Sequence, residues 1–121
     1  MQINIKATHH ELTAETRSLV QTKFSNLEKV TRGAAVEPTL SCEIEQSIAV
    51  ERAGAKYRVE GNLTVDGKLF RAEAEGATLE EAVDTVRDGL VREVTQSRGR
   101  TRELVKRGGS AIKRMLRFSQ D

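Results

Sequence analysis

The sequence contains one cysteine, two histidines and no tryptophan, and its hydrophobic residues never form a long run. A single thiol cannot form an internal disulfide, and His9 and His10 cannot complete a set of zinc ligands with Cys42 alone. The absence of about 18 consecutive apolar residues excludes a membrane-spanning helix, and no apolar segment typical of a secretory signal follows the first residues. We therefore expect a cytoplasmic protein with no membrane partner.

Sequence motifs of catalysis and cofactor binding are also missing. There is no P-loop, dinucleotide fingerprint, nucleophile elbow or zinc-ligand spacing. His9 and His10 are adjacent and point to opposite sides of an extended backbone, and Cys42 falls on an expected core face. We interpret these residues as loop histidines and a buried thiol. The sequence therefore predicts no enzyme, no cofactor and no small-molecule substrate.

The N-terminal half of the chain alternates between strand and helix patterns. Residues 2–7 alternate apolar and polar side chains, as in a half-buried strand. Apolar residues then recur at helical spacing behind the N-cap residue Thr13, which predicts one helix from residue 14 to residue 30. After the only proline, apolar residues occupy the even positions of residues 40–50, which predicts a long amphipathic strand.

The pair Asp66–Gly67 separates two further alternating segments and predicts a hairpin. Both residues of a two-residue hairpin turn need positive φ, which favours Asp-Gly. Apolar residues lie at odd positions before the turn and at even positions after it, so pairing Val65 with Lys68 makes one face entirely apolar or small. The same register places Glu60 opposite Glu73 on the outer face, where we expect a mild repulsion.

A second helix begins near residue 79. The segment Thr78–Glu81 forms a capping box, and Gly99 either ends the helix or only weakens it, by about 1 kcal/mol. The apolar stripe of this helix consists of Leu79, Val83, Val86, Leu90 and Val94.

The order of these elements predicts an α+β fold. We expect a β-α-β-β-β-α two-layer sandwich in which both helices cover one face of a four-stranded sheet. Residues 1–107 form the domain, and residues 108–121 are interpreted as a basic flexible tail. In some arrangements of this sheet, the second or the fourth strand lies at an edge and can pair with a strand of another chain. The sequence therefore leaves undecided whether the protein self-associates.

Charge is distributed unevenly along the chain. Residues 1–86 contain 10 Lys+Arg and 14 Asp+Glu, a net charge of −4, whereas residues 87–121 contain 10 and 4, a net charge of +6. This asymmetry predicts a polyanion-binding C-terminal part, and the predominance of arginine favours bidentate contacts with phosphate. The cations of the second helix and its continuation are Arg87, Arg92, Arg98, Arg100, Arg102, Lys106 and Arg107.

Aromatic residues are too few and too badly placed to stack unpaired bases. Phe24 and Phe70 fall on expected core faces, and Tyr57 and Phe118 are isolated. We therefore expect backbone and shape readout of structured RNA, and the element order resembles double-stranded RNA-binding domains in outline. A membrane surface or an acidic protein partner is the less favoured alternative to RNA, and it rests on apolar residues of segment 112–116 that share one helical face.

A series of short segments then occurs in a characteristic order: Met1–Ile5, Glu11–Thr13, Lys23–Phe24, Leu27–Lys29, Ala74–Gly76, Leu79, Ala82–Asp84 and Arg92. In combination, over residues 1–105, they resemble the ribosome hibernation promoting factor family, also called ribosome-associated inhibitors or sigma-54 modulation proteins. The resemblance implies binding to the small ribosomal subunit between head and body, in the channel for messenger and transfer RNA. It implies that idle ribosomes are silenced in stress or stationary phase.

In that family, cations on the two helices contact ribosomal RNA. The matching positions here are Lys23, Lys29, Arg92, Arg98 and Arg100. Together with the other cations of the second helix, they form the candidate RNA-binding site.

The chain departs from the family pattern at several positions of this surface. Glu80 stands where the family usually has tyrosine, and Asn26, Gly89 and Gln96 stand where lysine is common. We expect the charge from Arg98 to Arg107 to compensate. Long family members carry a further domain that pairs ribosomes, and the residues here after position 107 are too few to form one. The chain therefore resembles a short form of the family, or a long form cut back, and the resemblance implies inactivation of single ribosomes.

Two other functions fit the same residues. A general structured-RNA-binding protein would bind any long duplex as well as it binds ribosomes. A protein-interaction module that regulates transcription would instead recognise an acidic partner through the same basic residues.

Overall fold

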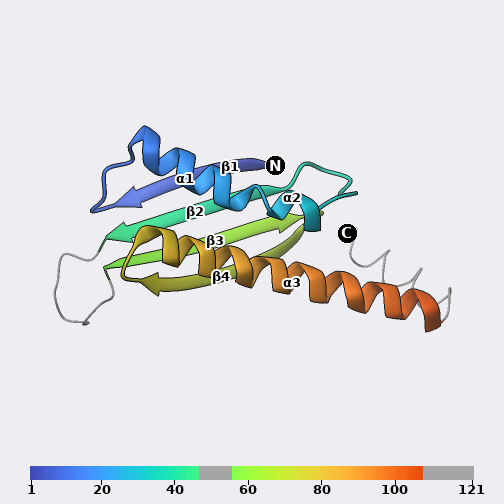
Figure 1. The fold of residues 1–121 in the computed structure, drawn as a ribbon. Coiled ribbons are helices and arrows are strands. Elements are labelled where there is room, and N and C mark those ends of the chain that lie inside the picture. Colours follow the sequence, from blue (N-terminus) through green and yellow to red (C-terminus); the bar gives the residue numbers. More distant parts are fainter. Residues whose placement is uncertain (47–55, 108–121) are drawn as a thin grey trace.

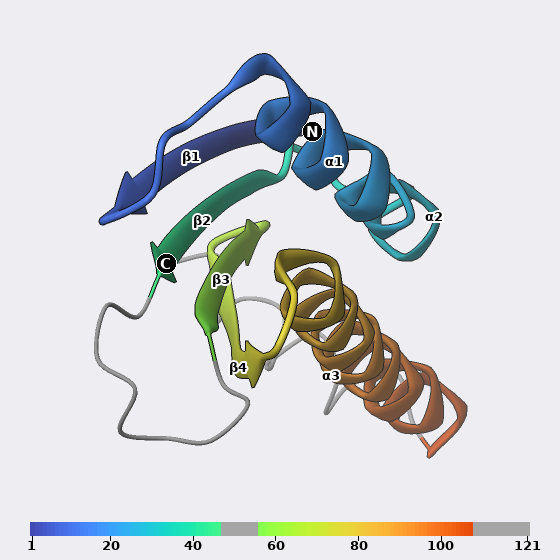
Figure 2. The same cartoon turned by 60° about the vertical axis from the view of Figure 1, so that its left-hand side comes forward.

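A four-stranded sheet covered on one face by helices forms the fold in the computed structural model of this protein (Figure 1). The structure describes residues 1–46 and 56–107, with side chains as far as Thr101. The expected α+β class is confirmed, and Figure 2 shows the helices together on one side of the sheet. In chain order the elements are β1 (Gln2–Thr8), α1 (Ala14–Phe24), α2 (Leu27–Val30), β2 (Thr39–Gln46), β3 (Tyr57–Val65), β4 (Lys68–Gly76) and α3 (Leu79–Arg107).

The strands lie in the order β1-β2-β3-β4, with β1 parallel to β2 and the other pairs antiparallel. The predicted hairpin register is confirmed, since Val65 pairs with Lys68 and each pair behind them follows in step. Asp66 and Gly67 have φ values of 47° and 79°, as the two-residue turn requires. Of the two strands considered as possible edge strands, β4 does lie at an edge of the sheet. β2 is instead an inner strand between β1 and β3.

The single helix predicted for residues 14–30 is wrong, because the structure divides it into α1 and α2. Ser25 Oγ donates to the backbone carbonyl of Thr22 at 2.6 Å and so competes for a helical acceptor. The amides of Glu28 and Lys29 then bond to carbonyls only three residues earlier, which tightens the backbone. Leu27 nevertheless stays fully buried, so the apolar stripe continues across the break.

The two ends of α3 differ in how they are defined. At its start, the Glu81 amide donates to Thr78 Oγ1 at 3.2 Å and the Thr78 amide donates to Glu81 Oε2 at 3.4 Å, which confirms the capping box. Gly99 does not end the helix, which continues to Arg107 beyond the sheet (Figure 1). A Cβ at Gly99 would contact nothing within 4 Å.

Two sequence predictions concern, in part or in whole, residues that the structure does not describe. The last positions of the strand expected at 40–50, from residue 47 onward, and the basic tail expected at 108–121 lie outside the described residues.

The core lies between the sheet and the helices. Gly61 of β3 lets α3 approach closely, since a Cβ there would be 2.8 Å from Val86 Cγ1. The fully buried large side chains of the core are Val20, Phe24, Leu27, Leu40, Cys42, Ile44, Val59, Leu63, Val83, Val86, Leu90 and Val94.

On the outer face of the sheet, two arginines offset the repulsion expected between Glu60 and Glu73. These residues do pair in the register, but Arg71 lies 3.2 Å from Glu60 and 3.8 Å from Glu73. Arg58 also contacts both carboxylates. Alternating charges on neighbouring strands therefore form a network in which the net interaction is attractive.

Candidate nucleic-acid interface

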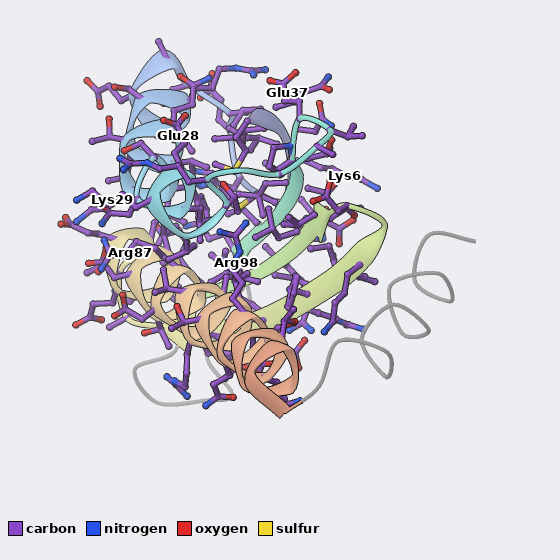
Figure 3. The ribbon with its side chains drawn as sticks, turned by 90° about the vertical axis from the view of Figure 1, so that its right-hand side faces the viewer. Lys6, Glu28, Lys29, Glu37, Arg87 and Arg98 are labelled. Carbon is purple, nitrogen blue, oxygen red and sulfur yellow. The ribbon has the colours of Figure 1, made fainter. Side chains whose placement is uncertain are left out.

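The segments α1 and α2 lie beside α3, and all three contribute cations to the helical side of the molecule. Figure 3 shows Lys29 of α2 with Arg87 and Arg98 of α3 in this helical layer, whereas Lys6 of β1 lies toward the sheet. The fold thus brings three of the predicted cations, Lys29, Arg87 and Arg98, to the helical side of the molecule.

Lys23, in the last turn of α1, is held by two carboxylates of α3. Its Nζ lies 3.0 Å from Glu80 Oε1 and 3.1 Å from Asp84 Oδ1. Hydrogen bonds to Glu80 and then to Asp84 stabilise the ammonium form and raise the pKa of Lys23 above its usual value. Lys23 therefore joins α1 to the first turns of α3, and its charge is already paired.

Arg87 is held in the same way by its own helix. Its Nη1 lies 3.0 Å from Asp84 Oδ1, and its Nε and Nη2 donate to Asp88 Oδ1 at 3.1 and 3.0 Å. All three nitrogens of the guanidinium therefore contact a carboxylate, and the side chain is only 19% exposed. Lys23 and Arg87 come from different helices and meet at Asp84.

Arg98 lies three helical turns further along the same flank of α3. Eleven residues of an α-helix rotate by about three full turns, so Arg98 lies within about 20° of the line through Arg87. Its Nη1 donates to the backbone carbonyl of Arg32 at 2.7 Å, which ties α3 to the segment that follows α2. Arg32 is itself exposed and was not among the predicted site residues. Its position depends on a contact 66 residues away in sequence, which no local pattern indicates.

Three other predicted cations are exposed, namely Lys29 of α2 and Arg92 and Arg100 of α3. Arg92 is five residues beyond Arg87, which places it about 140° around the helix, on another flank. None of the three forms an ion pair with a described side chain. The candidate surface therefore comprises one flank of α3 facing α1 and α2, with Arg92 about 140° around the helix and Arg100 about 80° beyond Arg92.

The last three predicted site residues, Arg102, Lys106 and Arg107, belong to the final turns of α3. Their side chains lie outside the described part of the chain, so their role stays a prediction. Arg102 follows Arg98 by four helical positions, which places it near the same flank.

Comparison with known proteins shows which family this arrangement belongs to. The profile of the family described as sigma 54 modulation protein / S30EA ribosomal protein matches residues 3–102. The chain belongs to this family. The resemblance deduced from the short segments is thereby confirmed.

Solved structures agree with the family assignment. The N-terminal domain of Protein Y from Thermus thermophilus is 25% identical in sequence, with a TM-score of 0.68 over 79% of this chain and 98% of that one. A ribosomal subunit interface protein from Coxiella burnetii is 15% identical, with a TM-score of 0.63 over 82% of this chain and 99% of that one, which shows a shared fold. A comparison with curated protein sequences finds no significant match.

The structure shows the surroundings of three positions of this S30EA family member that were expected to depart from the family pattern. Glu80 forms an ion pair with Lys23, as does Asp84. Gly89 faces β4, where a Cβ would lie 3.2 Å from the Cβ of Ala72, so a long side chain at this position would have to bend away from the sheet. Gln96 is exposed and simply lacks a charge.

Other polar residues of this family member have structural roles. His10 Nδ1 lies 2.9 Å from Gln46 Oε1 and its Nε2 lies 3.3 Å from Thr16 Oγ1, so it joins the β1–α1 loop to β2 and α1. Cys42 is buried, as predicted. Within the described ranges, no three acidic, His or Cys side chains gather as a metal site, and no helix has the length and hydropathy for a membrane span.

Proposed function

We propose that this protein binds the small ribosomal subunit through its helical layer, in the channel for messenger and transfer RNA, and inhibits translation in idle ribosomes. The observation that carries the proposal is the gathering of cations from α2 and α3 on one side of a domain of the S30EA family. The names of the two similar structures, Protein Y and a ribosomal subunit interface protein, support a ribosomal partner.

The chemistry of this surface favours the RNA backbone over the bases. Exposed Lys and Arg side chains offer donors to phosphate oxygens, and the guanidinium groups of Arg92, Arg98 and Arg100 can each do so in a bidentate manner. Among the described aromatic residues, Phe24 and Phe70 are buried, and Tyr57 packs edge-on against His10. No aromatic side chain of the described part is thus presented for stacking, and recognition depends on where the phosphates lie.

Inhibition of translation then requires only that the protein occupies the channel. A rigid domain held by several phosphate contacts excludes the RNA that would otherwise fill the same channel, and no bond is formed or broken. Each phosphate that is neutralised releases counterions, so the affinity decreases steeply as the salt concentration rises. α3 continues to Arg107 beyond the sheet (Figure 1), and we expect its last cations to extend the RNA-binding surface at this end of the domain.

Sedimentation of the protein with isolated small subunits, large subunits and whole ribosomes tests this proposal. The series is run across salt concentrations and with excess duplex RNA as competitor. We expect co-sedimentation with small subunits and whole ribosomes that survives the competitor, and inhibition of translation in a purified system. The variant Lys29→Glu/Arg100→Glu should lose binding, because both side chains are exposed and have no ion-pair partner among the described residues.

The matched control is Lys6→Glu/Lys56→Glu, which makes the same charge change on exposed residues of β1 and of the segment before β3. Binding that survives in the control and is lost in the helical variant supports the helical layer as the interface. Equal loss in both variants would mean that only net charge matters. Binding that is lost to duplex RNA, or that is equal on large subunits, would instead identify a general structured-RNA-binding protein.

A further inference from the structure

Three carboxylates form a stripe along the first turns of α3. Glu80, Asp84 and Asp88 are spaced by four residues and so lie on one flank of the helix. They contact both of the cations that α1 and α3 present at this end, Lys23 and Arg87. Three negative charges therefore surround two positive ones, and the local charge is −1.

Asp84 is the central member of this stripe. Its Oδ1 is buried, and it lies 3.1 Å from Lys23 Nζ and 3.0 Å from Arg87 Nη1. Oδ1 accepts no hydrogen bond from either cation and is held by their charge, whereas Lys23 Nζ donates a hydrogen bond to Asp84 Oδ2 at 3.4 Å. The two outer members, Glu80 and Asp88, are 60% and 63% exposed, so they meet any phosphate that approaches Lys23 or Arg87.

Toward the opposite end of the same flank, no described carboxylate contacts a cation, and the nearest described acid in sequence is the exposed Glu28 of α2. Arg98 meets the backbone of Arg32 in the segment after α2, and Lys29 lies on α2 three residues before Arg32. None of the three forms an ion pair within the described residues. Arg98 lies about 16 Å along the helix axis from Arg87, because each residue advances about 1.5 Å. At physiological salt the screening length is about 8 Å, so the two ends act nearly independently on a charged ligand.

We propose that Glu80, Asp84 and Asp88 compete with RNA phosphates for Lys23 and Arg87 and thereby direct the RNA backbone to the Lys29, Arg32 and Arg98 end of the helical layer. The inference rests on the proposed RNA-binding function and deepens it, by separating cations that contact phosphate from cations that hold the helices together. Lys23, expected from the sequence to contact RNA, is instead structural. Arg32, which the sequence reasoning missed, becomes an RNA-contacting residue.

The raised pKa of Lys23 agrees with this division, because it shows that the ammonium is better stabilised in its ion pairs than in water. A phosphate must then displace a carboxylate that is already in contact, or bind beside it against like-charge repulsion. Repulsion of this kind is a common way for proteins to restrict where a charged ligand docks.

A double-mutant cycle on the affinity for isolated small subunits, followed by fluorescence anisotropy of the labelled protein, tests the inference. In the native chain, Lys23→Gln should change the affinity by less than about twofold, because a paired surface charge contributes little. In Glu80→Gln/Asp88→Asn, the affinity should rise about fivefold and the salt dependence should steepen, since freed cations add phosphate contacts. In that background, Lys23→Gln should now weaken binding. Asp84 is left intact because removing it would leave two cations without their central partner.

Two controls decide the interpretation. Glu43→Gln/Glu45→Gln makes the same change in net charge on the exposed outer face of β2, and it should raise the affinity much less. Arg32→Gln should weaken binding in the native chain. An equal gain from both acidic double variants, or a loss of affinity on Lys23→Gln in the native chain, would overturn the inference while leaving the proposed function intact. A native chain that binds neither duplex RNA nor small subunits would overturn both.

Discussion

Arg98 of α3 donates a hydrogen bond from Nη1 to the backbone carbonyl of Arg32, 2.7 Å away. The segment after α2 is also held by the β3–β4 turn, where the Asp66 carboxylate accepts from the amides of Ala35 and Val36 at 2.9 and 3.2 Å. A helix and a hairpin turn, both distant in sequence, thus fix the backbone that carries Arg32.

Replacing Arg98 should therefore affect both stability and binding. We expect Arg98→Ala to lower the free energy of unfolding by about 1 kcal/mol, because the Arg32 carbonyl loses a charged donor at a half-exposed site. The same change should weaken co-sedimentation with small subunits. Arg92→Ala removes an equal charge from an exposed site without such a bond, and it should leave urea unfolding unchanged. Equal unfolding free energies for the two variants would contradict a positioning role for Arg98.

The thiol of Cys42 should be nearly inert in the folded protein. Burial in the core, with a smaller contribution from the Glu43 charge, raises its pKa to about 12. The thiolate is the reactive form, so at pH 8 a disulfide reagent should react at least about 100-fold more slowly with the native chain than with the chain in urea. Ser41→Cys adds an exposed thiol next to it as an internal standard. Rapid modification of two thiols in that variant would show that Cys42 is accessible.

The parts of the fold that follow from neighbouring residues were predictable from the sequence. The hairpin register depends on a two-residue turn and on alternation beside it, and the start of α3 depends on a capping box, Thr78–Glu81. The division between α1 and α2 also has a local cause, because Ser25 Oγ competes for a backbone carbonyl. The sequence pattern does not reveal this division, because the apolar stripe continues through Leu27.

The candidate site was less predictable, because its decisive contacts are not local. A helical pattern shows that Lys23 and Asp84 each lie on an accessible flank, but not that these flanks face one another across 61 residues of sequence. The basic character of α3 was therefore evident from composition, whereas the pairing of Lys23 and Arg87 and the exposure of Arg32 required the packing of α1 and α2 against α3.

Glu60 should make the stability of the domain depend on pH in the acid range. A hydrogen bond from Asn62, with the charges of Arg71 and Arg58, lowers the pKa of Glu60 below 4.5, although partial burial opposes the shift. A lowered carboxyl pKa in the folded state contributes stability above the unfolded value, and this contribution is lost as pH decreases through the folded value. We expect Glu60→Gln to be destabilised by up to about 1 kcal/mol at pH 7.

Urea unfolding of both chains at pH 7 and pH 3 measures this contribution. The difference between native and Glu60→Gln should shrink at the lower pH, where the native carboxyl gains its proton. Glu45→Gln, an exposed acid on the same outer face, should show no comparable change with pH. A constant difference between native and Glu60→Gln at the two pH values would exclude the ionic contribution.

Two glycines of the same domain should respond in opposite directions to alanine. A Cβ at Gly61 would lie 2.8 Å from Val86 Cγ1 and 3.1 Å from Leu90 Cδ1, and both of these side chains are fully buried. The branched valine cannot turn away in a filled core, so Gly61→Ala should destabilise by about 1–3 kcal/mol. Gly99 lies within α3 in open space, so Gly99→Ala should stabilise by up to about 1 kcal/mol.

Thermal unfolding followed by circular dichroism distinguishes the two cases, and a third variant identifies the cause. If the cost at Gly61 comes from the close approach of α3, Gly61→Ala/Val86→Ala should be less destabilised than the sum of its single changes. Strictly additive losses would place the cost in the strand backbone of β3 instead. In either case, a higher midpoint for Gly99→Ala is expected, because alanine there loses less backbone freedom on folding and meets no neighbour.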